Sequence, residues 1–475
     1  MISFILNERE YTSKLPPGAV TLDLLRKEAG LTGTKEGCRE GDCGACTVLL
    51  GIPLHHGMKY MALNSCLLPV GELQGRHLVT IEGVNPGEGF SFIQTVFVDE
   101  GASQCGFCTP GNIMSLTGYL LSTVNPEAAA AADSLGGNIC RCTGYVSIRK
   151  AAETVSCKIS HSPADSCFTH EHIEWLVAND ILPPYFLSIE ERLHQMDTGE
   201  SSEPEYSSEP AFTVAGGTDL FATEAENLRN AGIRFLLRNS EFNKISVKDN
   251  RTIIGAGATV TDIINAGVFE NTGNLHQSLK LISSSQVRNR ATAGGNIVNA
   301  SPIGDLTIIF LALNAKVKIK DGSGLREARL KEFFKGYKEL DLSPGELVES
   351  LEFLSPDAAT RVNFEKVSMR KHLDIATVNT AAALRVSRGK FVKADFSAGG
   401  VAPIPLYLEK TSDSLIGQRV STETARMAVR IARSEVSPID DVRGSAEYKK
   451  LLLGRLIAAH FVQLFPELIA GKELL

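Results

Sequence analysis

The sequence lacks several features that would assign it to whole classes of protein. No apolar run in its 475 residues approaches the roughly 20 residues that a transmembrane helix needs, so we expect no membrane span. Basic residues are not in excess, because 48 Lys and Arg stand against 55 Asp and Glu, which argues against nucleic acid as a partner. No basic segment precedes the short apolar run at residues 1–6, so we expect no secretory signal peptide and a cytoplasmic protein.

Cysteine is missing from the greater part of the chain. All 10 cysteines lie between Cys38 and Cys167, and none follows. Ten cysteines in so long a chain are too few for a disulfide scaffold. In a reducing compartment, such clustering indicates metal binding or catalysis.

Composition and turn signals predict a multidomain α+β protein, in keeping with its length. We predict a linker over residues 157–210, with a short helical stretch around residues 173–176. The linker ends in a polar, acidic, Pro-bearing stretch over residues 196–210 that cannot bury a core. The predicted parts are a β-rich unit over 1–80, a helical unit over 81–156 with a helix start near Pro110, the linker over 157–210, an α+β part over 211–358, and a C-terminal part over 359–475 that ends in helices around Thr422–Glu435 and Ala446–Leu464.

The first cysteine group has the spacing C-x4-C-x2-C with a fourth cysteine downstream. Its members are Cys38, Cys43, Cys46 and Cys66. This is the spacing of plant-type [2Fe–2S] ferredoxins. Glycines at 37, 41 and 44 allow tight turns and leave backbone N–H groups free to donate to cluster sulfur. A structural zinc site is the alternative, but zinc sites usually show paired short knuckles, so we favour an iron–sulfur cluster.

The second cysteine group has the pattern C-x2-C…C-x-C. Its members are Cys105, Cys108, Cys140 and Cys142. A lone C-x2-C often marks zinc or a redox pair, whereas C-x-C closes a tight ring that suits a zinc knuckle less well. Two such pairs on a helical unit predict a second [2Fe–2S] cluster. Cys157 and Cys167 match no motif, and we assign them no role.

The runs EGDCGACTV, QCGFCTPG and NICRCTGY together resemble the molybdenum hydroxylases, the family of xanthine dehydrogenase and aldehyde oxidase. The resemblance covers residues 1–156. It implies a β-grasp, ferredoxin-like domain over 1–80 and a four-helix domain over 81–156, each with one [2Fe–2S] cluster. It also implies that Gln104 and Cys142 face the pterin of a partner's molybdenum cofactor.

Three later segments carry glycine-rich or polar motifs. At residues 213–220 a Gly-Gly turn follows an apolar strand, and such turns let backbone N–H groups approach a pyrophosphate. Residues 286–305 add a second Gly-Gly with hydroxyl, amide and acidic groups, and residues 370–379 form the third element. All three resemble the flavin part of the same family, which implies a vanillyl-alcohol-oxidase-type FAD domain over 211–358 and a C-terminal flavoprotein domain over 359–475.

The resemblance also implies which residues hold FAD. The pyrophosphate would be cradled by Val214, Ala215, Gly216, Gly217, Thr218, Asp219 and Leu220. The second loop would add Thr292, Gly295 and Asn296, with Asp305 on the adenosine side, Lys366 near the polar edge of the flavin, and Ile282 and Val348 packed against it.

Residues 253–260 begin like the dinucleotide fingerprint of a Rossmann fold. The third glycine is missing, with Val260 in its place, and no acid follows at a convincing distance of about 20 residues. We therefore predict a structural strand, turn and helix. NAD, if used, is then expected to bind transiently over the flavin.

In the order of its motifs the chain resembles the xanthine dehydrogenase members of this family, which implies an NAD-dependent oxidoreductase. The resemblance implies that electrons pass from a molybdopterin–molybdenum centre on a large partner chain through two [2Fe–2S] clusters to FAD and then NAD. It also implies a dimer of heterodimers. No residue of this chain is predicted to be catalytic. The alternatives are the equivalent subunit of another molybdenum hydroxylase, with an aldehyde or N-heterocycle as substrate and a different acceptor, and a free-standing iron–sulfur flavoprotein diaphorase.

Overall fold

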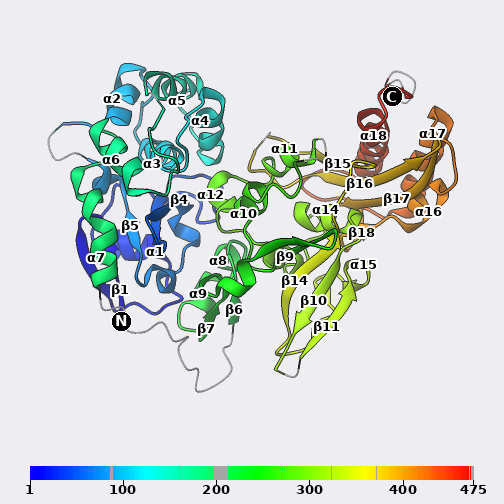
Figure 1. The fold of residues 1–475 in the computed structure, drawn as a ribbon, viewed down its shortest axis with the longest axis horizontal. Coiled ribbons are helices and arrows are strands. Elements are labelled where there is room, and N and C mark those ends of the chain that lie inside the picture. Colours follow the sequence, from blue (N-terminus) through cyan, green and yellow to red (C-terminus); the bar gives the residue numbers. More distant parts are fainter. Residues whose placement is uncertain are drawn as a thin grey trace. The chain divides into compact units, whose positions relative to one another are not determined.

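The structure is a computed structural model that describes residues 1–85, 89–159, 161–196, 212–270, 272, 274–322, 324–370, 372–469 and 471. The chain forms two compact units (Figure 1). Unit 1 contains Met1–Phe235 and Ser284–Arg290, and unit 2 contains Leu236–Ser283 and Ala291–Leu475. Both units combine helices with sheets, as the sequence predicts.

Unit 1 is built around a five-stranded sheet with the order β2-β1-β5-β3-β4. The strands are β1 (Ile2–Leu6), β2 (Arg9–Ser13), β3 (Thr47–Pro53), β4 (Met58–Asn64) and β5 (His77–Val79). β1 is parallel to β5, and the other neighbours are antiparallel. Successive side chains of a strand point to opposite faces. Phe4 and Leu50 accordingly lie in one hydrophobic cluster, whereas Ile5 and Leu49 lie in another, so both faces are buried.

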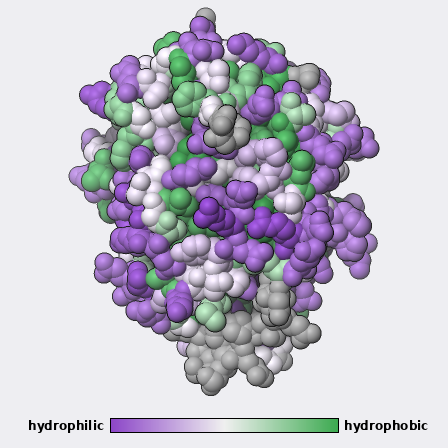
Figure 2. Space-filling model, turned by 90° about the vertical axis from the view of Figure 1, so that its left-hand side faces the viewer, coloured by the Kyte–Doolittle hydropathy of each residue, from purple (hydrophilic) through white to green (hydrophobic). Residues whose placement is uncertain are grey.

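One face of this sheet is covered by a short helix and the other by a helical bundle. The helix α1 (Thr21–Asp23) continues into a π-helical segment, η1 (Leu24–Glu28), whose Leu24 and Leu25 pack in the same cluster as Phe4. This is the β-grasp arrangement that the resemblance implies. Figure 2 shows a face of unit 1 on which polar residues surround smaller apolar areas.

The bundle consists of α2 (Phe92–Asp99), α3 (Thr109–Leu120), α4 (Ala128–Ser134) and α5 (Val146–Lys158). A capping box between Ser91 and Gln94 fixes the start of α2. α3 begins at the Pro-Gly segment that the sequence singled out, and it approaches the sheet closely. A Cβ on Gly118 would lie 2.9 Å from side-chain atoms of both Leu49 and Ala62, so only glycine fits there. The helical unit predicted for this part of the chain is present.

The predicted linker needs a correction. Within it, the structure has α6 (His170–Ala178), a 3-10 turn η6 (Pro184–Ser188) and α7 (Ile189–Gln195). Ile173, Leu176 and Leu193 are buried in the same cluster as the bundle. These apolar residues recur at helical spacing, so residues 161–196 pack into unit 1 rather than link domains. The rest of the predicted linker, 197–210, lies outside the described residues.

The start of the predicted flavin domain also belongs to unit 1. It comprises β6 (Phe212–Val214), α8 (Leu220–Thr223), α9 (Ala225–Leu228) and β7 (Ile233–Phe235), joined by α12 (Ser285–Arg288) from later in the chain. β6 is parallel to β7. Val214 and Phe221 are buried in one cluster with Cys46 and Cys66, which ties this segment to the five-stranded sheet.

Unit 2 contains an antiparallel five-stranded sheet with the order β11-β10-β14-β9-β8. Its elements are β8 (Ile245–Lys248), β9 (Arg251–Gly255), α10 (Val260–Asn265), α11 (Leu275–Leu279), α13 (Ala293–Val298), α14 (Asp305–Ala312), β10 (Lys316–Lys320), β11 (Leu325–Arg329), α15 (Leu330–Phe333), β12 (Phe334–Gly336), β13 (Glu339–Leu340) and β14 (Leu347–Leu354). The passage from β9 through a turn into α10 confirms the predicted structural strand, turn and helix.

The C-terminal part of unit 2 is a second antiparallel sheet, β15 (Thr360–Val367), β16 (Val378–Ser387), β17 (Lys390–Gly399) and β18 (Leu406–Tyr407). Three helices follow: α16 (Glu409–Leu415), α17 (Thr422–Glu435) and α18 (Ala446–Leu464). The last two confirm the predicted helices. Among the described residues, no helix is both long and apolar enough to span a bilayer.

Candidate functional site

The first cysteine group lies in one loop and one short turn of unit 1. Cys38, Cys43 and Cys46 occupy the loop that leads into β3, and Cys66 lies in the 3-10 turn η2 (Ser65–Leu67). The thiols form two close pairs, because Cys43 is hydrogen-bonded to Cys38 and Cys66 to Cys46. The charge of Cys38 also acts on Cys46 and Cys66, so the two pairs are neighbours. The structure thus brings together the four cysteines that the spacing singled out.

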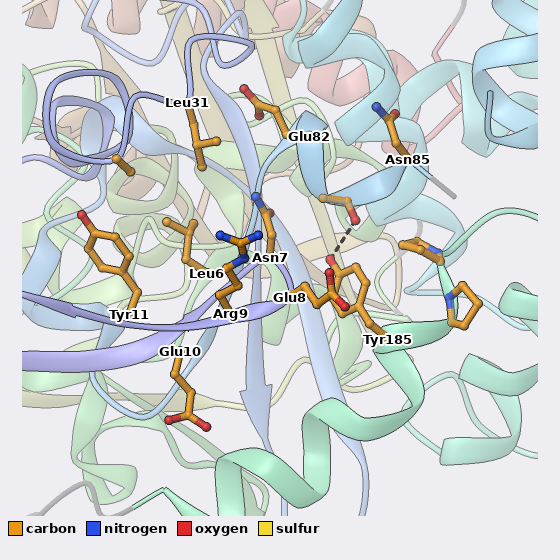
Figure 3. Close-up of a pocket in the computed structure, with 14 residues that line it drawn as sticks. Leu6, Asn7, Glu8, Arg9, Glu10, Tyr11, Leu31, Glu82, Asn85 and Tyr185 are labelled. Atoms are coloured by element: carbon orange, nitrogen blue, oxygen red, sulfur yellow. Dashed lines mark hydrogen bonds between the residues drawn. The ribbon is translucent and has the colours of Figure 1, made fainter. Parts of the chain in front are cut away.

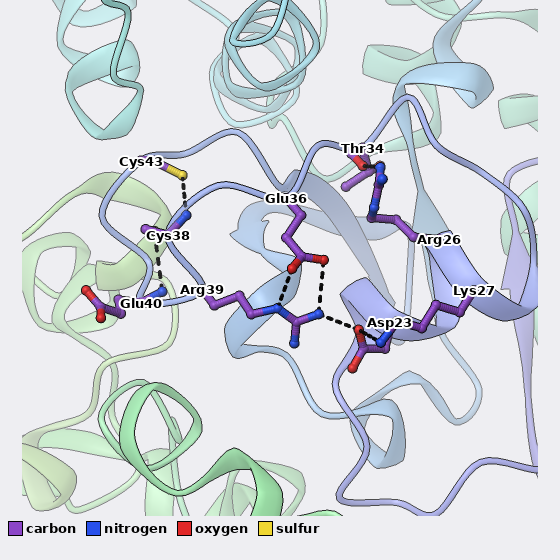
Figure 4. A network of polar contacts seen from close by, with 9 residues as sticks. All are labelled: Asp23, Arg26, Lys27, Thr34, Glu36, Cys38, Arg39, Glu40 and Cys43. Carbon is purple, nitrogen blue, oxygen red and sulfur yellow. Dashed lines mark hydrogen bonds and ion pairs between the residues drawn. The ribbon is translucent and has the colours of Figure 1, made fainter.

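Backbone N–H groups point at the sulfur atoms of the first pair (Figure 4). The N–H groups of Glu40 and Asp42 each donate to Cys38 Sγ at 3.3 Å, and the N–H of Cys38 donates to Cys43 Sγ at 3.4 Å. Gly41 makes this turn possible, because its φ of +81° is a conformation that other residues rarely adopt. Such N–H donors stabilise negative charge on sulfur.

Within each pair of the first group, one thiol has a lowered pKa and the other a raised pKa. The hydrogen bond from Cys43 lowers the pKa of Cys38 to about 5, and the same contact raises the pKa of Cys43. The hydrogen bond from Cys66 likewise lowers the pKa of Cys46, whereas that of Cys66 is raised. Each pair therefore favours one thiolate, which is the form that ligates metal.

Arg39 anchors the first cysteine loop to the neighbouring helix (Figure 4). Its guanidinium donates to Glu36 at 2.8 Å and to Asp23 at 2.5 Å. Asp23 is also paired with Lys27 at 3.1 Å. Because Arg39 directly follows Cys38, this network fixes the point where the loop begins.

The second cysteine group lies in two loops of the helical bundle. Cys105 and Cys108 precede α3, and Cys140 and Cys142 precede α5. These thiols also form two pairs: Cys142 Sγ lies 3.5 Å from Cys105 Sγ, and Cys140 is hydrogen-bonded to Cys108. The pair of Cys105 and Cys142 is exposed, and the pair of Cys108 and Cys140 is buried.

Polar neighbours hold Cys140 in place. The N–H of Cys140 donates to the Tyr145 hydroxyl at 3.1 Å, and the Thr143 hydroxyl lies 3.2 Å from Cys140 Sγ. Burial opposes ionisation of Cys140, but hydrogen bonds from Thr143, Cys142 and Cys108 together outweigh it and lower its pKa. Burial raises the pKa of Cys108 to about 12. This buried pair thus also holds one thiol that ionises more readily than the other.

The pairing of the thiols fits a dinuclear cluster better than a single ion. Each iron of a [2Fe–2S] cluster takes two thiolates, so two neighbouring pairs are the donor arrangement it requires. A structural zinc ion requires its thiolates to converge on one point. Both cysteine groups therefore fit [2Fe–2S] clusters.

The first predicted FAD loop lies in unit 1, between β6 and α8. Gly217 has a φ of +72°, and a Cβ there would lie 2.9 Å from the Phe221 ring and 3.0 Å from Val214. The Gly217 carbonyl accepts from the Phe221 N–H at 2.9 Å, which starts α8. The other predicted residues of this loop lie in the same turn or at its end: Ala215, Gly216, Thr218, Asp219 and Leu220. A glycine turn between a strand and a helix fits a pyrophosphate cradle.

Arg290 is a buried residue of unit 1 that the sequence analysis missed. Its Nε donates to the Gly216 carbonyl at 2.9 Å, and its Nη1 lies 4.0 Å from Glu72 Oε2. Glu72 is itself paired with Arg76 at 2.7 Å. Burial lowers the pKa of Arg290, while Glu72 opposes this shift. No local sequence pattern reveals the contact between Arg290 and Gly216, because the two residues lie 74 positions apart in the sequence.

The second predicted FAD loop lies in unit 2, at the start of α13. Thr292 Oγ1 accepts from the Gly295 N–H at 3.0 Å and so caps this helix. Asn296 Oδ1 accepts from the Thr307 N–H at 3.0 Å. Gly295 is exposed, which leaves its backbone accessible to a ligand. The donor set of hydroxyl, amide and exposed backbone fits the polar part of a dinucleotide.

Asp305 and Lys366 form an ion pair in unit 2. Lys366 Nζ lies 2.7 Å from Asp305 Oδ2, and Asn379 donates to the other carboxylate oxygen at 2.5 Å. The FAD positions predicted for Asp305, on the adenosine side, and for Lys366, near the polar edge of the flavin, stay predictions. Ile282 and Val348 are buried in the core of unit 2, and their flavin contact stays a prediction.

A pocket of about 610 Å³ in unit 1 contains none of the predicted site residues (Figure 3). It lies beside the β1–β2 turn and Tyr185. The Tyr185 hydroxyl donates to the Gly83 carbonyl at 2.7 Å, and Asn7 is hydrogen-bonded to the Thr80 backbone at 2.8 Å. These polar groups of the wall thus have partners within the chain, and we assign the pocket no ligand.

Four family profiles match successive parts of the chain. They are the 2Fe-2S iron-sulfur cluster binding domain over 4–70, the [2Fe-2S] binding domain over 80–153, the FAD binding domain in molybdopterin dehydrogenase over 199–353, and the CO dehydrogenase flavoprotein C-terminal domain over 364–464. The class that the fold and the cysteine groups define is therefore an iron–sulfur flavoprotein.

Relatives with curated names extend this result. The chain is 28% identical to the xanthine dehydrogenase of Emericella nidulans, over 88% of this chain and 35% of that protein. It is 27% identical to aldehyde oxidase 1 of Bos taurus, over 99% of this chain and 40% of that protein. This chain thus spans well under two thirds of the length of either relative.

Among solved structures, the chain resembles the carbon monoxide dehydrogenase of Hydrogenophaga pseudoflava in a form that lacks the Mo-pyranopterin moiety of the molybdenum cofactor. The TM-score is 0.51 at 25% identity, over 54% of this chain and 90% of that chain. With its two [2Fe–2S] domains followed by an FAD domain, the chain belongs to the molybdenum hydroxylase family. The predicted family and fold class are confirmed, whereas the domain limits other than the linker, and the site residues, stay predictions.

Proposed function

We propose that this chain carries electrons within an NAD-dependent xanthine dehydrogenase, from a molybdenum centre on a partner chain to NAD. One observation supports the proposal above all. The two cysteine groups, each arranged as two thiol pairs, lie in the same compact unit as the first Gly-Gly loop. When bound, [2Fe–2S] clusters exchange single electrons and FAD exchanges one or two, so the set converts between one-electron and two-electron chemistry.

The proposed role of the chain's own residues is to hold and tune these groups. The eight paired cysteines would ligate iron, and the N–H groups of Glu40 and Asp42 would stabilise negative charge on the first cluster. The Gly217 turn and the Thr292 loop are each proposed to bind a polar part of FAD. Asp305 would hold the adenosine side and Lys366 would lie near the polar edge of the flavin.

Xanthine and NAD are the substrate and acceptor that we propose. The match to a named xanthine dehydrogenase supports them. Aldehyde oxidase 1 matches at nearly the same identity, which favours a second candidate: the equivalent part of an aldehyde-oxidising enzyme with a different acceptor.

The proposed partner is a large chain that holds the molybdopterin–molybdenum cofactor. The chain spans only 35% of its xanthine dehydrogenase relative, and both of its predicted cofactor types are electron carriers. We propose a dimer of heterodimers in the cytoplasm. Co-purification of a large molybdenum-containing chain with the tagged protein would test the partner.

An anaerobic absorbance titration of the purified full-length chain with NADH tests the acceptor. We expect the flavin and iron–sulfur bands to bleach together. A loaded flavin that stays oxidised with NADH but bleaches with dithionite would overturn NAD as the acceptor. Protein purified anaerobically with almost no iron and no flavin would overturn the whole proposal.

Two cysteine variants make the iron measurement specific. Cys43→Ser removes a predicted ligand of the first cluster and should lower the iron content by about half. Cys157→Ser changes an exposed cysteine outside both groups and should leave the iron content as in the wild type. Equal iron in the two variants would contradict the ligand assignment.

A further inference from the structure

Gln286 belongs by sequence to the second FAD motif, but its side chain contacts the helical bundle of unit 1. The motif begins at this residue, but the structure buries it in unit 1, at only 1% exposure. Its side-chain amide donates to Ser115 Oγ at 2.8 Å and to Asn138 Oδ1 at 3.1 Å. Both partners belong to the helical bundle, 171 and 148 residues away in the sequence.

Asn138 connects the loops of the two cysteine groups. Its Nδ2 donates to the carbonyl of Gly44, which directly follows Cys43, at 3.0 Å. The next residue, Ile139, donates its backbone N–H to the Cys43 carbonyl at 2.9 Å. Cys140 of the second group follows immediately. Two hydrogen bonds therefore join the first cysteine loop to the backbone segment that carries Cys140 and Cys142 of the second cysteine group.

The packing around this contact leaves no room for adjustment. A Cβ on Gly44 would overlap the Gly137 carbonyl, and a Cβ on Gly111 would overlap the Gly44 carbonyl. A Cβ on Gly137 would overlap the side chain of Gln286 itself. Three glycines thus let the two loops and Gln286 come together, and a buried polar contact of this kind must be satisfied by these partners.

Two donors, Gln286 at 3.1 Å and the Ser115 hydroxyl at 2.8 Å, fix how the Asn138 amide is turned. An asparagine amide has an acceptor oxygen on one side and a donor nitrogen on the other. Because Gln286 donates to the oxygen, the nitrogen must face the Gly44 carbonyl. Without a donor at position 286, Asn138 Oδ1 keeps the Ser115 hydroxyl, whose single proton is shared with the Gly111 carbonyl. The Asn138 amide is then held less firmly, and its hydrogen bond to the first cysteine loop weakens.

We propose that Gln286 is a positioning residue that sets the contact between the two iron–sulfur loops rather than a flavin ligand. This inference rests on the proposed function, since it assumes that each cysteine group holds a cluster. It extends that function by assigning the spacing of the two clusters to one side chain that a later part of the sequence supplies.

Amide hydrogen exchange and electron paramagnetic resonance of the full-length chain test the proposal. Gln286→Glu keeps the shape but replaces the donor with an acceptor. We expect the backbone amide of Ile139 to exchange about tenfold faster. The reason is that the hydrogen bond from residue 286 to Asn138, the neighbour of Ile139, is lost. With both clusters reduced, we expect the magnetic interaction between them to weaken, at unchanged iron per chain.

Two further variants keep the test specific. Gln277→Glu makes the same change at an exposed glutamine of α11 and should alter neither signal. Asn138→Asp still accepts from Gln286 but cannot donate to Gly44, so it should reproduce the effect of Gln286→Glu, and it carries the test if that variant does not fold.

The two proposals fail in different ways. Absence of iron from the wild-type chain would overturn the proposed function, while the exchange of Ile139 would still report on Gln286. Unchanged exchange and an unchanged magnetic interaction in Gln286→Glu, with iron retained, would overturn the positioning role alone. The same changes in Gln277→Glu would also overturn it.

Discussion

Glu72 is wholly buried, and its carboxylate lies beside two arginines, Arg76 and Arg290. Glu72→Gln should lower the free energy of unfolding of unit 1 by about 3–5 kcal/mol, because it leaves buried positive charge without its counter-charge. Fluorescence of Trp175, the single tryptophan, follows urea unfolding of this unit. The exposed change Glu10→Gln is the matched control. Adding Arg290→Met to Glu72→Gln should recover part of the loss, and no recovery would contradict the pairing.

His77 makes the stability of unit 1 depend on pH. Its Nε2 donates to the Asn7 carbonyl at 2.9 Å and its Nδ1 faces the Tyr60 hydroxyl at 2.8 Å, so the neutral ring is satisfied. Burial lowers the pKa of His77 to about 3. The unfolded chain takes up a proton near pH 6.5 and the folded chain does not. This contribution to stability is therefore full above pH 6.5 and is lost as the pH falls toward 3, by about 1.4 kcal/mol per unit.

His77→Gln removes this titration. The difference in urea midpoint between the wild type and the variant should shrink steadily from pH 7 to pH 5, as followed by tryptophan fluorescence. His56→Gln changes an exposed histidine and should show no such trend. A difference between wild type and His77→Gln that stays constant with pH would contradict the assignment.

At the scale of elements, α8 is held by the iron–sulfur part of the chain. Phe221 of α8 is buried in one cluster with Cys46 and Cys66. Phe221→Ala should destabilise unit 1 by about 3–5 kcal/mol through the cavity it leaves, measured as a shift of the tryptophan-detected transition. Phe90→Ala, at a side chain that is 67% exposed, is the control. An unshifted transition in Phe221→Ala would mean that α8 does not belong to this unit.

Elements with strong local signals could be predicted from the sequence, and elements defined by distant partners could not. The helices Thr422–Glu435 and Ala446–Leu464 follow from their amphipathic pattern, and the cysteine loops follow from spacing. The contacts of α7 with Glu8 and Gly57 and the place of Gln286 depend on partners more than a hundred residues away. A local pattern carries no information about such contacts.

At the scale of the whole molecule, iron should stabilise one unit and not the other. All eight predicted ligands lie in unit 1, and a group that binds only the folded state stabilises it. Removing iron should lower the unfolding temperature of the tryptophan-detected transition by roughly 6–12 °C, for a loss of about 3 kcal/mol. The second calorimetric transition should stay in place. A common shift of both transitions would contradict this division.

The path of the chain between the units has a consequence for how the protein is made. Unit 1 includes Met1–Phe235, but it is complete only when Ser284–Arg290 joins it. During synthesis, unit 1 therefore cannot complete its fold until the ribosome has produced Ser284–Arg290, which follows part of unit 2 in the sequence. In evolution, a gene divided after Phe235 would place Gln286 and Arg290 on a different polypeptide from Asn138 and Glu72. Relatives with separate iron–sulfur and flavin genes would then have to rebuild these contacts between two chains.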